Sequence, residues 1–200
     1  MRAVGGLYSV PMPSYSLYFD KTREPIVSDD ANPSPPPDAA TGAAPPEGAV
    51  RGPDQLRDTI VALFGQAHRA VRLASPYLDR RIFNTGAMAN AIASFARQHA
   101  RNRAYILIED ATQVRQDNDR LIVLLRRLAD GVELREVDET DRGARDLYLL
   151  TDFTACLFQE DVGRSDAVVS RKPNEIAARL GRFDAAWERA NPIAIGTLGL

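Results

Sequence analysis

The segment Ala104–Glu109, with the sequence AYILIE, carries apolar side chains at both odd and even positions. Successive residues of a β-strand point to opposite faces of the sheet, so a strand of this composition is buried on both sides. Such strands occur in parallel sheets that helices cover on each face. The segment therefore predicts a central parallel strand in an α/β domain.

Helix-like and strand-like patterns alternate on both sides of this segment. Apolar side chains recur at three- and four-residue spacing in each expected helix, and the expected strands are short apolar runs. The helices are Asp54–Ala67, about Thr85–His99 and Asp117–Ala129, and the strands are Ala70–Ser75 and Val132–Val137. Asp54 can cap the first helix, and the half-exposed pattern of Val132–Val137 is typical of a strand nearer the edge of a sheet.

The last third of the domain predicts a hairpin and a final helix. Leu147–Thr151 and Ala155–Gln159 are apolar strands whose three-residue link favours an antiparallel hairpin. Pro173 begins a helix in which apolar residues up to Trp187 lie at helical spacing, and Pro192 follows its end. The complete order of elements predicts an α/β fold with a mixed β-sheet and helices on both faces.

Both ends of the chain are predicted to be flexible tails. Ten of the 13 prolines lie in residues 1–53, and this composition buries too little apolar area to offset the entropy of ordering. We therefore expect a disordered tail over residues 1–53, a domain over 54–191 and a flexible tail over 192–200. Tyr15–Phe19 is strand-like: it is a loose segment, a partner-binding segment, or part of a wrongly assigned coding start.

Composition and net charge limit the possible cellular compartments and binding partners of this chain. The net charge is −2, so no strong field attracts nucleic acid or an acidic membrane surface. No apolar run approaches the roughly 20 residues that span a bilayer. The single cysteine, Cys156, lies in an apolar strand and predicts a buried thiol in a reducing compartment. These features predict a cytoplasmic protein.

Three segments resemble one half of the phospholipase-D superfamily fold. They are the strand ending in Ala74–Leu78 (ASPYL), the strand closed by Leu149–Asp152 (LLTD) and the last helix with Phe183–Glu188 (FDAAWE). The likeness covers about residues 54–190 and implies a single phospholipase-D-like half. Active single-repeat members of that family pair two halves, so the resemblance also implies a homodimer.

The family's catalytic residues do not match this sequence. Active members carry His-x-Lys and, after four further residues, Asp, with a Gly-Ser-x-Asn run downstream. When the family's Asp is aligned with Asp152, the His position falls on Arg145 and the Lys position on Leu147. Arginine stays protonated and cannot act as a nucleophile, and the leucine side chain has no group that binds phosphate. The nearest downstream run is VGRSD (162–166), so the chain more narrowly resembles a degenerate bacterial domain that is sometimes fused behind acetyltransferases.

Two loops are predicted to hold any ligand. In open α/β sheets ligands bind beyond the carboxyl ends of parallel strands, where residues 77–81 and 110–115 should lie. The candidate ligand-binding residues are Asp79, Arg80, Arg81, Asp110 and Arg115. The guanidinium groups of these arginines could bind an anionic ligand there through paired hydrogen bonds. The alternative is that both aspartates cap helices and pair with neighbouring arginines. His68 and His99 lack a third ligand at metal-like spacing, so we expect no metal and no cofactor.

Three hypotheses of function follow. The first is a non-catalytic binding or regulatory module for a protein partner or an anionic ligand. The second is a phosphodiesterase or nuclease with a non-standard site around Arg145, Asp146 and Asp152. The third is a nucleic-acid binder that keeps the phosphate groove. The missing His and Lys favour the first hypothesis, and the near-neutral charge weighs against the third, because nonspecific affinity for nucleic acid depends on released counterions.

Overall fold

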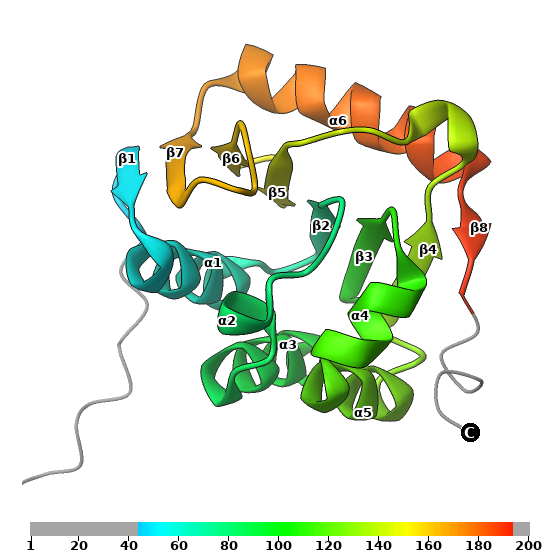
Figure 1. Cartoon of the computed structure of the whole chain (residues 1–200). Coiled ribbons are helices and arrows are strands. Elements are labelled where there is room, and N and C mark those ends of the chain that lie inside the picture. Colours follow the sequence, from blue (N-terminus) through cyan, green and yellow to red (C-terminus); the bar gives the residue numbers. More distant parts are fainter. Residues whose placement is uncertain (1–43, 194–200) are drawn as a thin grey trace, which may run out of the picture. The chain divides into compact units, whose positions relative to one another are not determined.

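A mixed sheet organises residues 44–193, the part of the chain that this computed structural model describes (Figure 1). Within these residues the sheet has eight strands in the order β1-β7-β6-β5-β2-β3-β4-β8. The strands are β1 Gly48–Arg51, β2 Ala70–Ala74, β3 Arg103–Ile108, β4 Val132–Glu136, β5 Leu147–Thr151, β6 Ala155–Gln159, β7 Asp166–Ser170 and β8 Asn191–Pro192. The predicted mixed α/β fold is confirmed.

Helices cover both faces of this sheet (Figure 1). The first five lie on one face and α6 crosses the other, which gives three layers. The helices are α1 Pro53–Gln66, α2 Arg80–Phe83, α3 Gly86–Gln98, α4 Ala111–Asp117, α5 Asp119–Arg127 and α6 Pro173–Arg189, with a 3-10 turn at Glu139–Asp141.

The predicted central strand and hairpin are both confirmed. β3 runs parallel to β2 and to β4 and lies between them. Its Ile106 and Ile108 side chains pack in the core shared with α1, α3 and α5, and Leu107 packs in the core under α6. β5 and β6 pair antiparallel, with Leu149 opposite Leu157. Burial on two faces thus explains why the β3 segment has no polar alternation.

The two cores differ in composition. The core on the α1–α5 side is mainly aliphatic, with Leu63, Ile92 and Leu125 among its fully buried side chains. The core on the α6 side is built around rings. Phe183 stacks on Trp187 with their centroids 5.5 Å apart, and Tyr148 meets Phe183 edge to face at 6.5 Å. Both cores depend on apolar burial, and ring geometry adds specificity to the second.

The predicted helix over Asp117–Ala129 corresponds to α5, but α4 precedes it in a segment that was predicted to be a loop. The structure has two shorter helices, α4 and α5, which Asn118 separates. Asp110 begins α4 by accepting hydrogen bonds from the backbone N–H groups of Thr112 and Gln113. Asn118 is fully buried and donates from Nδ2 to the carbonyl of Leu78 at 2.8 Å. This tertiary contact fixes the break between the helices, which periodicity alone did not reveal.

The structure also differs from the predicted boundaries at both ends of the domain. β1 pairs antiparallel with β7, and Val50 within it is 4% exposed, so the predicted tail over 1–53 extends too far. Asn191 and Pro192 pair with β4, and Ile193 donates to the carbonyl of Leu134. These edge strands are too short to carry a periodic signal of their own. Tyr15–Phe19 and residues 194–200 lie outside the described residues.

Candidate functional site

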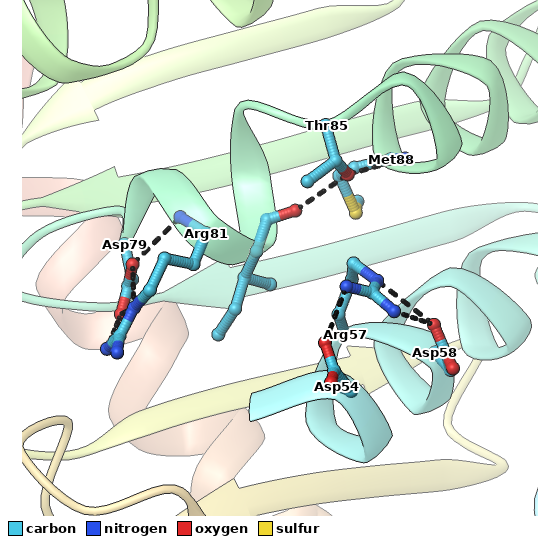
Figure 2. A network of polar contacts seen from close by, with 8 residues as sticks. Asp54, Arg57, Asp58, Asp79, Arg81, Thr85 and Met88 are labelled. Carbon is cyan, nitrogen blue, oxygen red and sulfur yellow. Dashed lines mark hydrogen bonds and ion pairs between the residues drawn. The ribbon is translucent and has the colours of Figure 1, made fainter. Parts of the chain in front are cut away.

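Asp79 and Arg81 of the first predicted ligand loop bind each other. The Asp79 carboxylate caps α2 by accepting from the backbone N–H of Arg81 at 2.9 Å. The Arg81 guanidinium folds back on the same carboxylate, with Nη2 and Oδ2 2.6 Å apart (Figure 2). This bond is the main reason that the pKa of Asp79 lies below its usual value. Arg81 therefore already has a carboxylate partner.

The second predicted loop is a helix in the structure. Asp110 caps α4, and Arg115 is exposed on that helix. A shallow surface hollow brings Asp79, Arg80 and Arg81 beside Gln113 and Asp117 of α4. Asp110 and Arg115 do not line this hollow. Helix capping, the alternative reading of both aspartates, is thus confirmed, whereas only three of the five predicted residues lie together.

Charged residues on α1 pair in the same local way. Arg57 donates to Asp54 and to Asp58, both at 2.9 Å (Figure 2). The predicted cap at Asp54 is wrong, because Gly52 is the N-cap residue and Pro53 begins the helix. Proline suits the first turn, where its missing N–H costs no helical hydrogen bond. Asp54 instead supplies a negative charge to the first turn.

Leu147 is the first residue of β5 and Arg145 lies just before it; these are the positions at which the resemblance places a His and a Lys. The Arg145 guanidinium contacts the Asp161 carboxylate, with Nη2 and Oδ2 2.6 Å apart. Leu147 is 2% exposed and belongs to the core on the α1–α5 side. Neither side chain offers an imidazole or an ammonium group.

Asp152 lies just beyond the opposite end of β5 and clamps the connection between α1 and β2. Its carboxylate accepts hydrogen bonds from three successive backbone N–H groups, those of His68, Arg69 and Ala70. Asp152 itself has a positive φ of 47°, a conformation that aspartate tolerates better than most residues. These contacts give Asp152 a structural role in holding the two elements together.

Both histidines are exposed. His68 reaches Asp152 through its backbone N–H. His99 accepts a hydrogen bond at Nδ1 from the backbone of Arg101. Within residues 44–193, no three His, Cys, Asp or Glu side chains gather as metal ligands. The same residues contain no helix with the length and apolar character needed to cross a membrane.

A cavity of about 70 Å³ lies at the carboxyl ends of β2 and β3, beneath α6. Its polar lining comes from five separate segments: Ser75 after β2, Glu109 after β3, Asp141 in the 3-10 turn, Asp146 and Tyr148 at β5, and Arg182 on α6. It occupies the end of the sheet where α/β proteins bind ligands. The cavity therefore lies at the end of the sheet that the sequence-based rule indicated.

Ion pairs organise the wall of this cavity. Arg182 binds Asp146 through both terminal nitrogens, at 2.6 and 2.8 Å, and this bond is the largest reason that the pKa of Arg182 is raised. Arg189 binds Asp141 in the same two-pronged way, at 2.9 and 2.6 Å. Tyr148 is 3% exposed, and burial raises the pKa of its phenol to about 12. Tyr148 is therefore a neutral hydroxyl at physiological pH.

None of these residues belongs to the ligand-binding set predicted from the sequence, although one signal in the sequence points to two of them. Asp146 and Tyr148 alternate with Arg145 and Leu147 along one segment, so they must face the opposite side of the sheet. From the sequence, Asp146 is a candidate only in the non-standard catalytic site with Arg145 and Asp152. Their partner Arg182 lies 36 residues from Asp146, a separation that no local pattern spans.

The sequence matches the family described as a domain of unknown function, DUF7931, over residues 52–194. The chain belongs to this family. No curated protein matches its sequence. The DUF7931 domain is structurally similar to Nuc from Salmonella typhimurium, a phospholipase D family member, with a TM-score of 0.51 and 13% identity. That likeness covers 68% of this chain and 90% of Nuc.

Two further solved structures are similar to the DUF7931 domain. TrmBL2, an archaeal chromatin protein described as showing a novel mode of DNA binding, has a TM-score of 0.53 and 18% identity, covering 78% of this chain. Phosphatidylserine synthase from Haemophilus influenzae has a TM-score of 0.50 and 13% identity, covering 73%. This chain spans 57% of TrmBL2 and 38% of the synthase. At such low identity these likenesses establish a phospholipase-D-like fold and nothing further.

Proposed function

We propose that this DUF7931 domain is a non-catalytic binding module that keeps the phospholipase-D-like fold without phosphodiesterase chemistry. The proposal rests on the contacts of the three side chains at the positions where the resemblance places the family's His, Lys and Asp. Arg145 is bound to Asp161, Leu147 is buried in the core, and Asp152 is bound to three backbone N–H groups. A phosphoryl-accepting nucleophile has to be exposed and able to lose its proton, and none of these side chains meets both conditions.

The geometry also opposes the alternative catalytic site around Arg145, Asp146 and Asp152. Asp146 is 9% exposed and has both carboxylate oxygens bound to Arg182. Asp152 lies at the far end of β5 from Arg145. General acid–base catalysis requires groups within hydrogen-bond reach of one reacting centre, and this arrangement separates them.

Hydrolysis of bis(p-nitrophenyl) phosphate tests the proposal. The full chain should release p-nitrophenol at the rate of buffer alone. The Arg145→Ala and Asp146→Asn variants should give the same rate, and thermal melting of each variant checks that it is folded. Hydrolysis above the buffer rate that falls in folded Arg145→Ala protein would falsify the non-catalytic assignment.

Polyanion binding on the α1–α5 side is a second candidate function. Among the described residues, Arg80, Arg115, Arg120, Arg126 and Arg127 have no carboxylate within ion-pair distance. All five are exposed. The similarity to TrmBL2 supports the same candidate, because that protein is described as binding DNA. Exposed, unpaired arginines can exchange their counterions for phosphate.

A matched pair of triple variants tests this second candidate. Replacing Arg120, Arg126 and Arg127 by Gln removes three unpaired cations, and replacing Arg57, Arg142 and Arg145 by Gln removes three cations that already have carboxylate partners. If this surface binds DNA, the first variant should lower the slope of log K against log salt by about 2 to 3, at about 0.9 per lost phosphate contact. The second should change it less. Absence of salt-dependent retention on heparin or DNA by the unaltered chain removes this candidate.

The resemblance to phospholipase D also leads us to propose a homodimer. Size-exclusion chromatography with light scattering tests that proposal directly: a monomeric mass at micromolar concentration contradicts it. The outcome does not decide whether the module is catalytic, because the hydrolysis assay measures that property separately.

A further inference from the structure

The cavity beneath α6 contains a polar group without a partner. The Tyr148 side chain lines this cavity and is 3% exposed. Its ring meets Phe183 and lies under the Arg182 guanidinium, 5.3 Å from the ring centroid. No residue within 44–193 makes a hydrogen bond to its hydroxyl group. The fully buried polar side-chain atoms without a partner among these residues are Asn102 Oδ1 and Asn118 Oδ1, so the Tyr148 hydroxyl is still open to the cavity and can accept a hydrogen bond from a ligand there.

The charge of the lining favours one kind of ligand. Asp146 and Asp141 each have both carboxylate oxygens occupied by an arginine. Glu109 differs from them. Its Oε1 accepts one hydrogen bond, from the backbone N–H of Ala144 at 2.9 Å, and no cationic side chain among the described residues lies within ion-pair distance. Glu109 is thus the half-buried carboxylate in this lining whose charge is not balanced.

An anionic ligand fits this lining poorly. The cationic member of the lining, Arg182, already directs its two terminal nitrogens at Asp146. A second anion would also meet the charge of Glu109 across a cavity of only about 70 Å³. Like charges at such short range in a partly dry site repel strongly. A cation with several N–H donors would instead be attracted by the charge of Glu109 and could donate hydrogen bonds to the oxygens of the lining.

The size of the cavity limits the ligand. A cavity needs at least about 10–15 Å³ to hold a single water molecule, so one of about 70 Å³ accommodates only a few heavy atoms. Alanine, proline, leucine and valine side chains form the rest of the lining. A short alkyl chain that ends in an ammonium group therefore matches both the apolar and the polar walls.

We propose that this cavity binds a small primary ammonium ion, with Glu109 as its counter-ion and the Tyr148 hydroxyl as a hydrogen-bond acceptor. An ammonium group carries one positive charge and three N–H donors, which suits one carboxylate and one hydroxyl. The proposal deepens the binding role proposed above, because it gives the module a ligand class. It uses the α6 side of the sheet, whereas Leu147 and the polyanion candidate belong to the other side.

Titration of the full-length chain with ethylammonium chloride, followed by amide NMR, tests the proposal. The Ala144 amide, which donates to Glu109, is the local reporter. We expect its resonance to shift in a saturable way with ethylammonium, and not with sodium acetate of equal ionic strength. Ethanol, which has the same size but no charge, should bind at least tenfold more weakly. Equal responses to acetate or ethanol, or no response to ethylammonium, overturn the proposal.

Three variants locate the binding site. Glu109→Gln keeps an oxygen for the Ala144 N–H but removes the charge, and it should raise the Kd for ethylammonium about tenfold or more. Tyr148→Phe removes only the hydroxyl and should raise the Kd several-fold. Asp110→Asn makes the same charge change one residue away, outside the cavity, and asparagine still caps a helix; its Kd should stay unchanged. Equal Kd values for Glu109→Gln and Asp110→Asn contradict the assignment.

The two proposals fail in different ways. If phosphodiester hydrolysis is found but ethylammonium binds through Glu109, the non-catalytic assignment fails and the cavity proposal stands. If neither hydrolysis nor ethylammonium binding occurs, the cavity proposal fails alone. A circular dichroism spectrum and a melting temperature for each variant separate loss of a contact from loss of the fold.

Discussion

The α6 side of the sheet and helices α3, α4 and α5 on the other side use arginine in opposite ways. Under α6, arginines lie over rings: Arg135 over Trp187 at 4.3 Å and Arg179 over Phe158 at 4.1 Å, each measured to the ring centroid. On α3, α4 and α5, exposed arginines such as Arg127 have neither a ring nor a carboxylate partner among the described residues. The α6 layer therefore holds its arginines in fixed positions, while α3, α4 and α5 leave theirs to solvent. On α1 and α2, Arg57 and Arg81 pair with neighbouring carboxylates.

This difference explains why the small-ligand cavity is found under α6. A binding site needs polar groups that are held in place by packing and by neighbouring hydrogen bonds. Tyr148 and Asp146 have such support from Phe183 and Arg182. The unpaired arginines of the other layer have no such constraint, so only a large, repetitive anion would gain much from them.

The largest expected effects concern the two cores, which should be equally necessary for folding. Phe183→Ala removes the ring that contacts both Tyr148 and Trp187, and it should lower the free energy of unfolding by about 3–5 kcal/mol. Leu63→Ala, at a fully buried position of the aliphatic core, should cost about 2–5 kcal/mol. Urea denaturation measures both values. A cost below about 1 kcal/mol for either variant would show that its layer is not part of the cooperative core.

Asp152→Ala should have the next largest effect. It removes a carboxylate that accepts three backbone N–H groups, and hydrogen bonds to charged groups contribute about 1.5–3 kcal/mol. We expect a loss of about 2 kcal/mol in the free energy of unfolding. Asp152→Asn keeps one accepting oxygen and should lose less. Equal stability of the alanine variant and the unaltered chain in urea would contradict the clamping role.

A smaller effect compares one arginine from each layer. Arg135→Ala loses the contact with the Trp187 ring and a hydrogen bond to the Trp187 carbonyl, and it should cost about 1 kcal/mol. Arg127→Ala, on the exposed face of α5, should change stability by less than about 0.5 kcal/mol. If the two substitutions cost the same in thermal or urea unfolding, the proposed contrast between the layers is wrong.

The smallest effect concerns alkaline pH and the α6 layer. Burial raises the pKa of the Cys156 thiol from 9.0 to about 11. The unfolded chain therefore releases this proton at lower pH than the folded chain does. The contribution of Cys156 to stability is complete below about pH 9 and is lost as the pH rises toward 11. The drop in unfolding free energy between pH 8 and pH 10 should be smaller in Cys156→Ala, and an identical drop contradicts the assignment.

Prediction from sequence succeeded where one segment carried its own signal. The unbroken apolar run of β3 and the three-residue link between β5 and β6 were both read correctly, because burial and hairpin geometry are properties of neighbouring residues. Prediction failed at β7 and at α4, whose residues were expected to form a loop. The pattern of β7 is only partly apolar, and α4 ends at Asn118, whose side chain reaches the carbonyl of Leu78, 40 residues away.

The candidate sites divide in the same way. The capping roles of Asp79 and Asp110 follow from the sequence as the alternative to ligand binding, because capping requires only a short polar side chain before a helix. The cavity under α6 could not be foreseen, since its polar walls come from five segments between Ser75 and Arg182. Glu109 and Tyr148 lie too far apart in the sequence for a local pattern to link them.

The sequence by itself determined the α/β class, the central strand and the absence of any His-x-Lys run. These are statements about residue identity and periodicity, which act over a few neighbouring positions. Only the tertiary structure decided what the remaining charged groups do. Asp152 became a clamp on His68–Ala70, more than 80 residues away, and Asp146 became the partner of Arg182. The order of the strands determines which of these residues come into contact, and that order follows from packing the whole sheet between its two helical layers.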